Sequence, residues 1–240
     1  GTLYGRNTMG GQMNIYSLSP LDYQGVRASA EYSSGNTMRG KASYYGLSKS
    51  GKFAYSVAGY YNRTDGFFEN EFDGRNVDWA ESSGGRVRAI WQLGSGWELD
   101  NILSVGYNDE GGYAYGLYDE QSGEVAGINY NSPSGYMRMN ISDGLVLSFT
   151  NDKLKFTSTT SYQYMSDKMR MDQDFQPASY FTLVQQLHEH AFAEDLVLRS
   201  NDKTNRWQWV TGLYGFYKNI DMNAPVTFLE DGINSLILGN

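Results

Sequence analysis

Hydrophobic and polar residues alternate with a period of two along most of this chain. The first clear run places Val26, Ala28, Ala30 and Tyr32 on one side and Arg27, Ser29 and Glu31 on the other. Successive side chains of a β-strand point to opposite faces, so the pattern predicts a strand with one apolar and one polar face. A second run follows at residues 38–45, after the turn-forming sequence SSGN. If the two runs pair as a hairpin, the acid on one polar face can meet the bases Arg39 and Lys41 on the other.

The same alternation predicts about nine strands, and no segment has a convincing helical period. The expected strands lie at residues 26–32, 38–45, 52–61, 86–93, 97–107, 145–150, 154–164, 190–199 and 207–217. In three of them the apolar face begins and ends with an aromatic residue, at 53–61, 97–107 and 207–217. A tilted strand of roughly 9–11 residues crosses a bilayer, and aromatic rings prefer the two headgroup levels. The alternative is a soluble sandwich or barrel, whose strands alternate in the same way.

The lengths of the connections favour the membrane alternative. Short turns are expected at residues 46–51, 94–96, 151–153 and 201–205, and long segments at 66–83, 108–140, 167–186 and from 219 onward. Short and long connections alternate almost strictly, with the brief link at residues 33–36 as the exception. Transmembrane barrels have tight turns at one end and long loops at the other. The predicted fold class is therefore all-β, a transmembrane antiparallel up-and-down β-barrel.

Composition narrows the classes of function. The 240 residues include 20 tyrosines and 28 glycines but only four prolines, a mixture that suits strands and turns. A net charge of -8 makes nucleic acid an unsuitable partner, because phosphate recognition needs a basic face. The absence of cysteine excludes disulfides, thiolate metal ligands and cysteine nucleophiles. No signal peptide precedes the first strand, so we expect a mature piece or an internal segment.

The first twenty residues carry a distinctive motif. GTLYGRNTMGGQMNIYSLSP resembles the end of the plug domain in TonB-dependent outer-membrane receptors, where a segment G-T-L-Y-G-R-N/S-x-x-G-G-x-I-N-I precedes the first barrel strand. Besides Gly1 and Thr2, the matching positions are Leu3, Tyr4, Gly5, Arg6, Asn7, Gly10, Gly11, Asn14 and Ile15. Met13 stands where the family usually has isoleucine. The glycines are interpreted as hinges that let the last plug segment turn tightly.

A weaker resemblance to the same family lies near the other end of the chain. Residues 194–200, EDLVLRS, are similar to the family pattern Q-E-L-R-L-x-S, with Glu194 in place of the glutamine and Val197 in place of the arginine. After a short turn, Trp209, Gly212, Leu213 and Tyr214 match the family's W-x-x-G-L-Y pattern. The two stretches bracket nearly the whole chain in the family's order.

The resemblance implies a plugged barrel of twenty-two strands, of which this chain supplies a part. Residues 1–20 are expected to be the C-terminal end of the plug domain, and residues 21–240 the N-terminal portion of the barrel. The implied function is receptor and transporter, not enzyme: TonB-dependent uptake of a scarce nutrient across the outer membrane of a Gram-negative bacterium. The commonest nutrient in the family is a ferric siderophore.

The implied partners are outer-membrane lipid, TonB and a small nutrient ligand such as an iron chelate. TonB is expected to act through a plug segment absent from this chain. Work for uptake comes from the inner-membrane proton gradient, so no cofactor is implied. The alternative function is that of a soluble or surface-attached β-protein that binds carbohydrate through loop tyrosines.

Several residues are candidates for contact with a ligand. The long segment 108–140 contains GGYAYGLYDEQSGE, and rigid tyrosine rings beside glycines make adaptable contact surface. We therefore expect Tyr113, Tyr115 and Tyr118 to contact the ligand, with Arg6 of the plug motif as a further candidate. Packing of that loop on itself, and pairing of Arg6 with a barrel carboxylate, are the structural alternatives. The polar faces that would line the lumen carry Arg27, Glu31, Arg39, Lys41, Arg86 and Arg88.

The remaining candidate chemistry is weaker. His188 and His190 share a strand face but have no evident third ligand, and a metal site needs at least three, so no metal site is predicted. The pairs Asp172 with Asp174 and Asp119 with Glu120 could serve glycoside cleavage or calcium binding, yet no EF-hand spacing accompanies them. The glycines of the opening motif lack the lysine and hydroxyl residue of a phosphate-binding loop.

Overall fold

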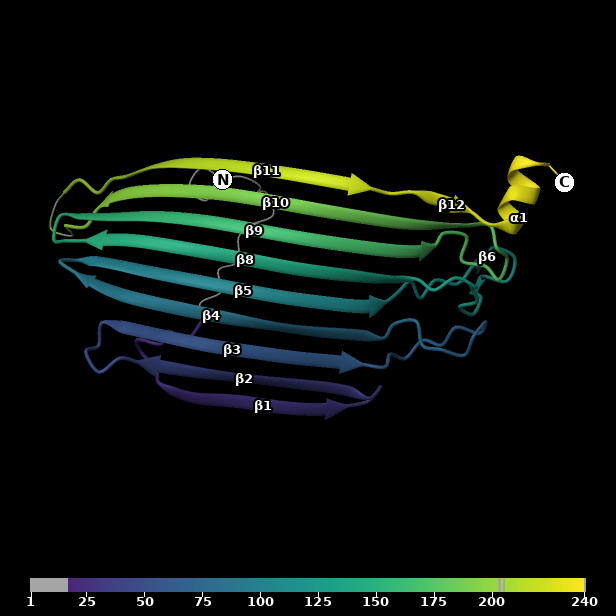
Figure 1. The fold of residues 1–240 in the computed structure, drawn as a ribbon, viewed down its shortest axis with the longest axis horizontal. Coiled ribbons are helices and arrows are strands. Elements are labelled where there is room, and N and C mark those ends of the chain that lie inside the picture. Colours follow the sequence, from purple (N-terminus) through teal and green to yellow (C-terminus); the bar gives the residue numbers. More distant parts are fainter. Residues whose placement is uncertain (1–16, 203, 205, 240) are drawn as a thin grey trace.

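One antiparallel sheet dominates the structure (Figure 1). The computed structural model describes residues 17–202, 204 and 206–239, so the motif at residues 1–16 lies outside the described part of the chain. The nine long strands are β1 (Gly25–Ser33), β2 (Thr37–Leu47), β3 (Phe53–Thr64), β4 (Ala80–Gly94), β5 (Trp97–Gly111), β8 (Gly135–Thr150), β9 (Leu154–Asp172), β10 (Phe181–Ser200) and β11 (Val210–Asn223). They pair with their neighbours in sequence order, each antiparallel to the next. The predicted all-β, up-and-down arrangement of nine strands is confirmed.

Smaller elements complete the chain. β6 (Tyr118–Asp119) and β7 (Glu124–Val125) form a separate two-stranded hairpin, and β12 (Val226–Phe228) pairs with the beginning of β10. A short helix α1 (Glu230–Gly232) continues into the π-helical turn η1 (Ile233–Ile237). The expectation of no helix was wrong for these last residues. No helix in the described part of the chain is long and apolar enough to cross a membrane.

Three strands are much longer than the alternation predicted. β8 begins ten residues before the expected start at 145, and β9 and β10 extend over most of the segment 167–186 that was expected to be a loop. The connection between β9 and β10 is only residues 173–180. In the extensions of β9 and β10 polar side chains occupy both faces, so the apolar period fades there. The extension of β8 still alternates, with Met137, Met139 and Ile141 on one face. The backbone ladder nevertheless continues, for example between Arg138 and Asp167.

Short turns and long connections lie at opposite ends of the sheet, except for the brief β1–β2 turn at residues 34–36, which lies with the long connections (Figure 1). The turns from β2 to β3, β4 to β5, β8 to β9 and β10 to β11 share one end. The opposite end, called here the loop end, carries the connections at residues 65–79, 112–134 and 173–180. An antiparallel meander must place alternate connections at opposite ends, so the sequence spacing translates directly into this asymmetry.

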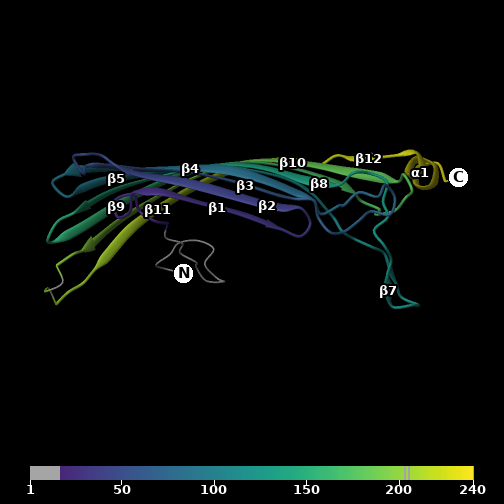
Figure 2. The same cartoon turned by 90° about the horizontal axis from the view of Figure 1, so that it is seen from below.

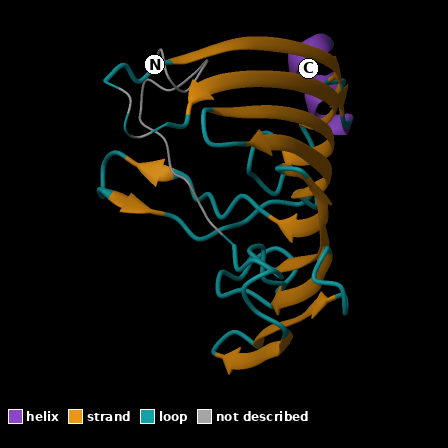
Figure 3. Cartoon of the chain, turned by 90° about the vertical axis from the view of Figure 1, so that its left-hand side faces the viewer, coloured by secondary structure: helices purple, strands orange, loops and turns teal. Residues whose placement is uncertain are grey.

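The sheet is curved, and its two faces differ in chemistry (Figures 2 and 3). Large apolar side chains stand exposed on the convex face; Val26, Leu103 and Leu213 are 68%, 41% and 73% exposed. The chain exposes 16134 Å², against about 10,800 Å² expected for a compact monomer of its mass. Among the described residues, Ala54, Val77, Ile90 and Tyr130 are the only buried hydrophobic ones. The apolar faces of these strands are therefore not covered by a core of the chain's own.

Charged residues pair on the concave face, as the predicted hairpin requires. Glu31 lies opposite Arg39 in the β1–β2 register, and their side chains form an ion pair of 3.0 Å. A less exposed pair joins β4 to β5, where Arg88 Nε and Nη2 donate to the two oxygens of Asp100 at 3.0 and 2.7 Å. The side chains of Arg88 and Asp100 are 17% and 14% exposed, compared with more than half for Arg39 and Glu31. Both pairs tie neighbouring strands together across the same face.

The two ion pairs are expected to contribute differently to the free energy of unfolding. Replacing Asp100 by asparagine leaves a poorly solvated guanidinium without its counter-charge, so we expect a loss of about 1–3 kcal/mol in the free energy of unfolding. The matched change Glu31→Gln on the exposed pair should cost no more than about 1 kcal/mol. Urea unfolding of the full-length protein, followed by the circular dichroism of the sheet, measures both. Equal losses in the two variants would contradict this ranking.

Candidate functional site

The long connections at the loop end are joined into one body by hydrogen bonds. The side chain of Asn70 is buried; its Nδ2 donates to the carbonyl of Tyr130 at 2.9 Å, and its Oδ1 accepts the Tyr130 N–H at 3.2 Å. The N–H of Glu71 donates to the carbonyl of Ile128 at 2.8 Å. The third connection joins through Asn131, whose Nδ2 donates to the carbonyl of Pro177 at 3.0 Å. Residues 65–79, 112–134 and 173–180 therefore support one another.

Aromatic rings from two of these connections gather in one cluster. Tyr115 and Phe175 lie edge to face with centroids 5.0 Å apart, and the rings of Tyr113 and Tyr130 lie 6.4 and 6.1 Å from Phe175. Tyr113 and Phe175 both adopt left-handed backbone conformations, with φ of 60° and 52°. Burial raises the pKa of Tyr130 to about 12, and its hydroxyl donates to the carbonyl of Gly112 at 2.7 Å. The cluster offers flat apolar surface beside hydroxyl groups.

The three predicted ligand tyrosines do not form a single site. Tyr113 and Tyr115 lie together, 5.9 Å apart, within this cluster. Tyr118 belongs to β6 and is 62% exposed. The β6–β7 hairpin projects away from the sheet on its concave side (Figures 2 and 3). Ligand contact by these tyrosines stays a prediction. Phe175 and Tyr130 were not predicted: contact between separate connections brings Phe175 beside Tyr113, and folding of the 112–134 connection back on itself brings Tyr130 there.

The acidic residues at the loop end have structural partners. Asp172 is fully buried, and its Oδ2 accepts the N–H of Ser132 at 2.9 Å. Asp174 accepts the N–H of Gln176, and Asp119 accepts the N–H of Gln121 within the β6–β7 turn. Asp174 and Asp119 therefore stabilise local turns, and Asp172 joins the end of β9 to the connection before β8.

The two histidines share one face of β10. His190 Nδ1 lies 2.9 Å from the hydroxyl of Tyr162, and His188 Nδ1 lies 3.4 Å from that of Tyr164. Glu189 points to the other face, where it forms an ion pair of 2.6 Å with Lys218. Within the described part of the chain, no cluster of three or more histidine and acidic side chains is placed to hold a metal ion.

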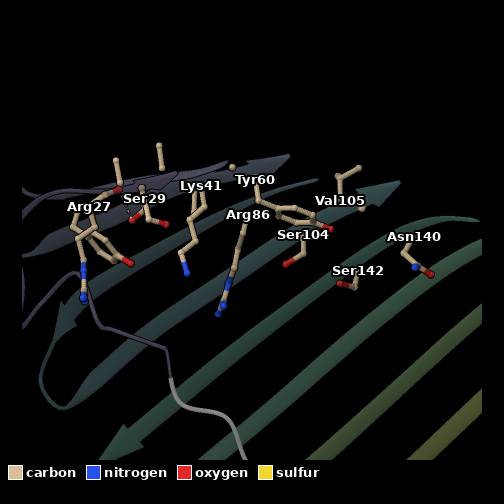
Figure 4. Close-up of a pocket in the computed structure, with 17 residues that line it drawn as sticks. Arg27, Ser29, Lys41, Tyr60, Arg86, Ser104, Val105, Asn140 and Ser142 are labelled. Atoms are coloured by element: carbon tan, nitrogen blue, oxygen red, sulfur yellow. Dashed lines mark hydrogen bonds between the residues drawn. The ribbon is translucent and has the colours of Figure 1, made fainter. Parts of the chain in front are cut away.

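A groove of about 910 Å³ crosses the concave face over β1 to β5 and β8 (Figure 4). Three cationic residues, Arg27, Lys41 and Arg86, line it, together with Tyr60 and several serines. In the register of the sheet, Arg27 and Arg86 fall in one row, and Ser43 and Ala58 lie between them. These small side chains leave space between the long ones. In Figure 4 the cationic side chains point to one side of the sheet, and Val105 points to the other.

Tyr60 forms part of the floor of this groove. A Cβ atom added at Gly84 would lie 2.6 Å from the Tyr60 ring, and one at Gly106 would lie 3.6 Å from its hydroxyl. The absence of side chains at these two glycines therefore lets the ring lie flat across β4 and β5. The period of two puts Tyr60 on the face opposite to Phe53 and Tyr61, the aromatic residues at the two ends of the apolar face. Its closeness to Arg86 depends on the strand register.

The first described residues lie against the same face. Arg86 Nη2 donates to Ser17 Oγ at 3.1 Å. Pro20 is fully buried, and its carbonyl accepts a hydrogen bond of 2.9 Å from Gln24 Nε2. The Tyr23 ring packs edge-on against Tyr45, with centroids 5.3 Å apart. The segment that leads into β1 thus starts from the concave side, while Arg6 and the rest of the opening motif lie outside the described residues.

Comparison with known proteins identifies the architecture. No protein-family model matches the sequence. The structure is similar to the crystal structure of the ferric yersiniabactin uptake receptor FyuA from Yersinia pestis, with a TM-score of 0.72 and 17% sequence identity. The match covers 85% of this chain but only 32% of that receptor's chain. At this identity the likeness shows the fold alone: the sheet has the same fold as about a third of that chain.

Asn70 gives a direct test of how the loop end is held together. In the isosteric variant Asn70→Asp, a carboxylate oxygen replaces the N–H donor that faces the Tyr130 carbonyl. We expect the amide of Tyr130 to exchange its hydrogen roughly 5- to 150-fold faster, because a buried polar group loses its partner. The control is Glu120→Gln, which replaces an acid by its amide on the exposed β6–β7 hairpin. It should leave the hydrogen-exchange rate of the Tyr130 amide unchanged. Unaltered exchange in Asn70→Asp would show that other contacts hold the connection.

Proposed function

We propose that this chain forms part of the wall of an outer-membrane receptor that takes up a scarce nutrient by TonB-dependent transport. The observation that carries the proposal is the exposed apolar convex face. It extends across nine paired strands, and no layer of the described chain covers it. The polar residues Asn101, Asp143 and Glu194 interrupt it, and each is hydrogen-bonded to a neighbouring side chain on the same face. On β5 this face begins at Trp97 and ends at Tyr107, with Leu99, Leu103 and Val105 between them. A face of this kind suits hydrocarbon, which also requires every strand inside it to have paired neighbours.

The division of the chain follows the same proposal. Residues 1–20 are the C-terminal end of a plug, and residues 21–240 belong to the barrel wall. The contact between Ser17 and Arg86 supports it, because it brings the chain toward β1 from the side on which a plug would lie. The partners are outer-membrane lipid at the convex face and TonB through a plug segment beyond this chain. The host is a Gram-negative bacterium.

The proposed ligand is a small iron chelate of the siderophore type. The structurally similar receptor takes up ferric yersiniabactin. In this chain the rings of Tyr113 and Tyr115 supply apolar and hydrogen-bonding surface at the loop end, where an external ligand would arrive. Uptake of this kind draws on the proton gradient through TonB and uses no resident cofactor. None of the proposed roles is that of a catalytic residue.

A soluble or surface-attached protein that binds carbohydrate is the second candidate. The exposure of Tyr115 and Tyr118, 56% and 62%, favours it, because exposed tyrosines can stack on sugar rings. The candidate requires that something other than lipid cover the convex face.

Extraction behaviour separates the two candidates. Expressed at full length in its native host, the protein should sediment with the outer membrane and dissolve only with detergent, since its apolar face is otherwise exposed to water. Sucrose-gradient fractionation followed by immunoblotting measures this. A monomer that stays in aqueous buffer without detergent would rule out the receptor.

Growth on defined iron sources tests the ligand class. A deletion strain should lose growth on at least one of a panel of ferric chelates, including ferric yersiniabactin, while growing normally on ferrous iron. Complementation with the wild-type gene restores growth, and the Tyr115→Ala variant should restore it less well than Tyr115→Phe because the ring supplies contact area. If growth is unchanged on every chelate while the protein is found in the outer membrane, the iron-chelate ligand is wrong and the receptor takes up another nutrient.

A further inference from the structure

We propose that the groove on the concave face binds the anionic groups of the solute during its passage, carboxylates in the first instance. The inference deepens the proposed function and rests on it, because it concerns the solute that the receptor takes up. Three features of the groove carry it: uncompensated positive charge, polar donors beside that charge, and space for a solute.

No acidic side chain of the described residues neutralises the positive charge of the groove. Among the described residues that line it, Arg27, Lys41 and Arg86 are cationic and none is acidic. None of the three forms an ion pair within the described part of the chain. Arg39 and Arg88, on the same face, are each paired with a carboxylate. A local cluster of three positive charges in a chain of net charge -8 focuses an attractive potential for anions.

Polar donors are arranged around these charges. Ser43 lies beside Arg27 in the β1–β2 register, and Ser104 lies beside Arg86 in the β4–β5 register. Arginine can hold a carboxylate with two parallel hydrogen bonds, and a neighbouring hydroxyl can donate a third. Arg27 and Arg86 are three strand spacings apart, about 14 Å, so a solute with several carboxylates can reach both. Lys41 lies in the adjacent row between them, in register with Ser29 and Tyr60.

The volume of the groove and its position complete the argument. A space of about 910 Å³ accommodates a solute of siderophore size. The groove runs along the middle of β1 to β5, away from the aromatic cluster at the loop end. A solute bound there would therefore have left its external site. Arg86 also holds Ser17 at 3.1 Å, so the segment before β1 reaches the groove and can respond to its occupation.

The test uses the full-length receptor, whose described segment contains no native cysteine to interfere. The variant S104C places a thiol in the groove, and S161C places one on the concave face of β9, outside the groove. Labelling is compared between a negatively charged and a positively charged methanethiosulfonate reagent. We take the labelling rate with the anionic reagent divided by the rate with the cationic reagent. This ratio should be roughly tenfold higher at position 104 than at position 161, and the difference should shrink as the salt concentration is raised.

Citrate, a tricarboxylate, is the ligand probe. It should slow labelling of S104C by a neutral methanethiosulfonate and leave S161C unaffected. Adding Arg86→Gln or Lys41→Gln should weaken this protection roughly tenfold, because each removes a charge-assisted hydrogen bond. Arg86→Lys should retain most of it. Arg39→Gln removes the same charge from a residue that is already paired, and it should change nothing.

Two results would overturn the proposal. One is that citrate fails to slow labelling of S104C, or still slows it when Arg86→Gln and Lys41→Gln are combined. The other is failure of any reagent to label S104C while S161C reacts, since another part of the receptor then fills the groove. Neither measurement depends on nutrient uptake. A groove that does not bind anions would therefore not contradict the proposed receptor function. Conversely, protection by citrate in a protein that fractionates as soluble would refute the receptor function alone.

Discussion

The antiparallel hydrogen-bond ladder from β1 to β11 is the constraint on which the rest of the structure depends. Because each strand pairs with its sequence neighbour, backbone donors and acceptors are satisfied within a single layer. Successive side chains then point to the two faces of the sheet in turn, apart from one register shift near the β4–β5 turn. Apolar residues that share a face cannot be folded inward, so they remain exposed unless hydrocarbon or another chain covers them.

Curvature gives the two faces different roles. The convex face presents Val26, Leu103 and Leu213 outward, while the concave face gathers cations from strands that are distant in sequence. Some of these charges brace the sheet, as Arg88 does with Asp100 across β4 and β5. Others, Arg27, Lys41 and Arg86, have no counter-charge within the described chain and line the groove. The meander also collects the long connections at one end, where Asn70 and Asp172 bind neighbouring segments and fix the positions of the aromatic rings.

Most of the sheet could be predicted from sequence, since strand alternation is a local property. Residues 26–32, 38–45 and 97–107 carry the pattern, with Asn101 as an exception on an apolar face, and each range lies within a strand of the structure. The extensions of β9 and β10 could not be predicted in this way, because polar residues occupy both faces there and pairing with a neighbouring strand maintains the extended backbone. The extension of β8 does alternate, with Met137, Met139 and Ile141 on one face, and the predicted strand began too late. The same limit applies to the tyrosines: sequence placed Tyr113, Tyr115 and Tyr118 in one long segment, and the β6–β7 hairpin separates the third from the others.

The amino-acid sequence alone determined most of the strand content, the polar and apolar faces, the alternation of short and long connections and the placement of Glu31 on a polar face that can meet Arg39 or Lys41. Each of these follows from side-chain periodicity and chain order, which are properties of neighbouring residues. Assembly of the sheet decided the rest: the row that joins Arg27 to Arg86, the ring of Tyr60 across Gly84, and the cluster of Phe175 with Tyr115. These contacts join residues far apart in the chain, and they depend on strand register, on curvature and on the hydrogen bonds between loops.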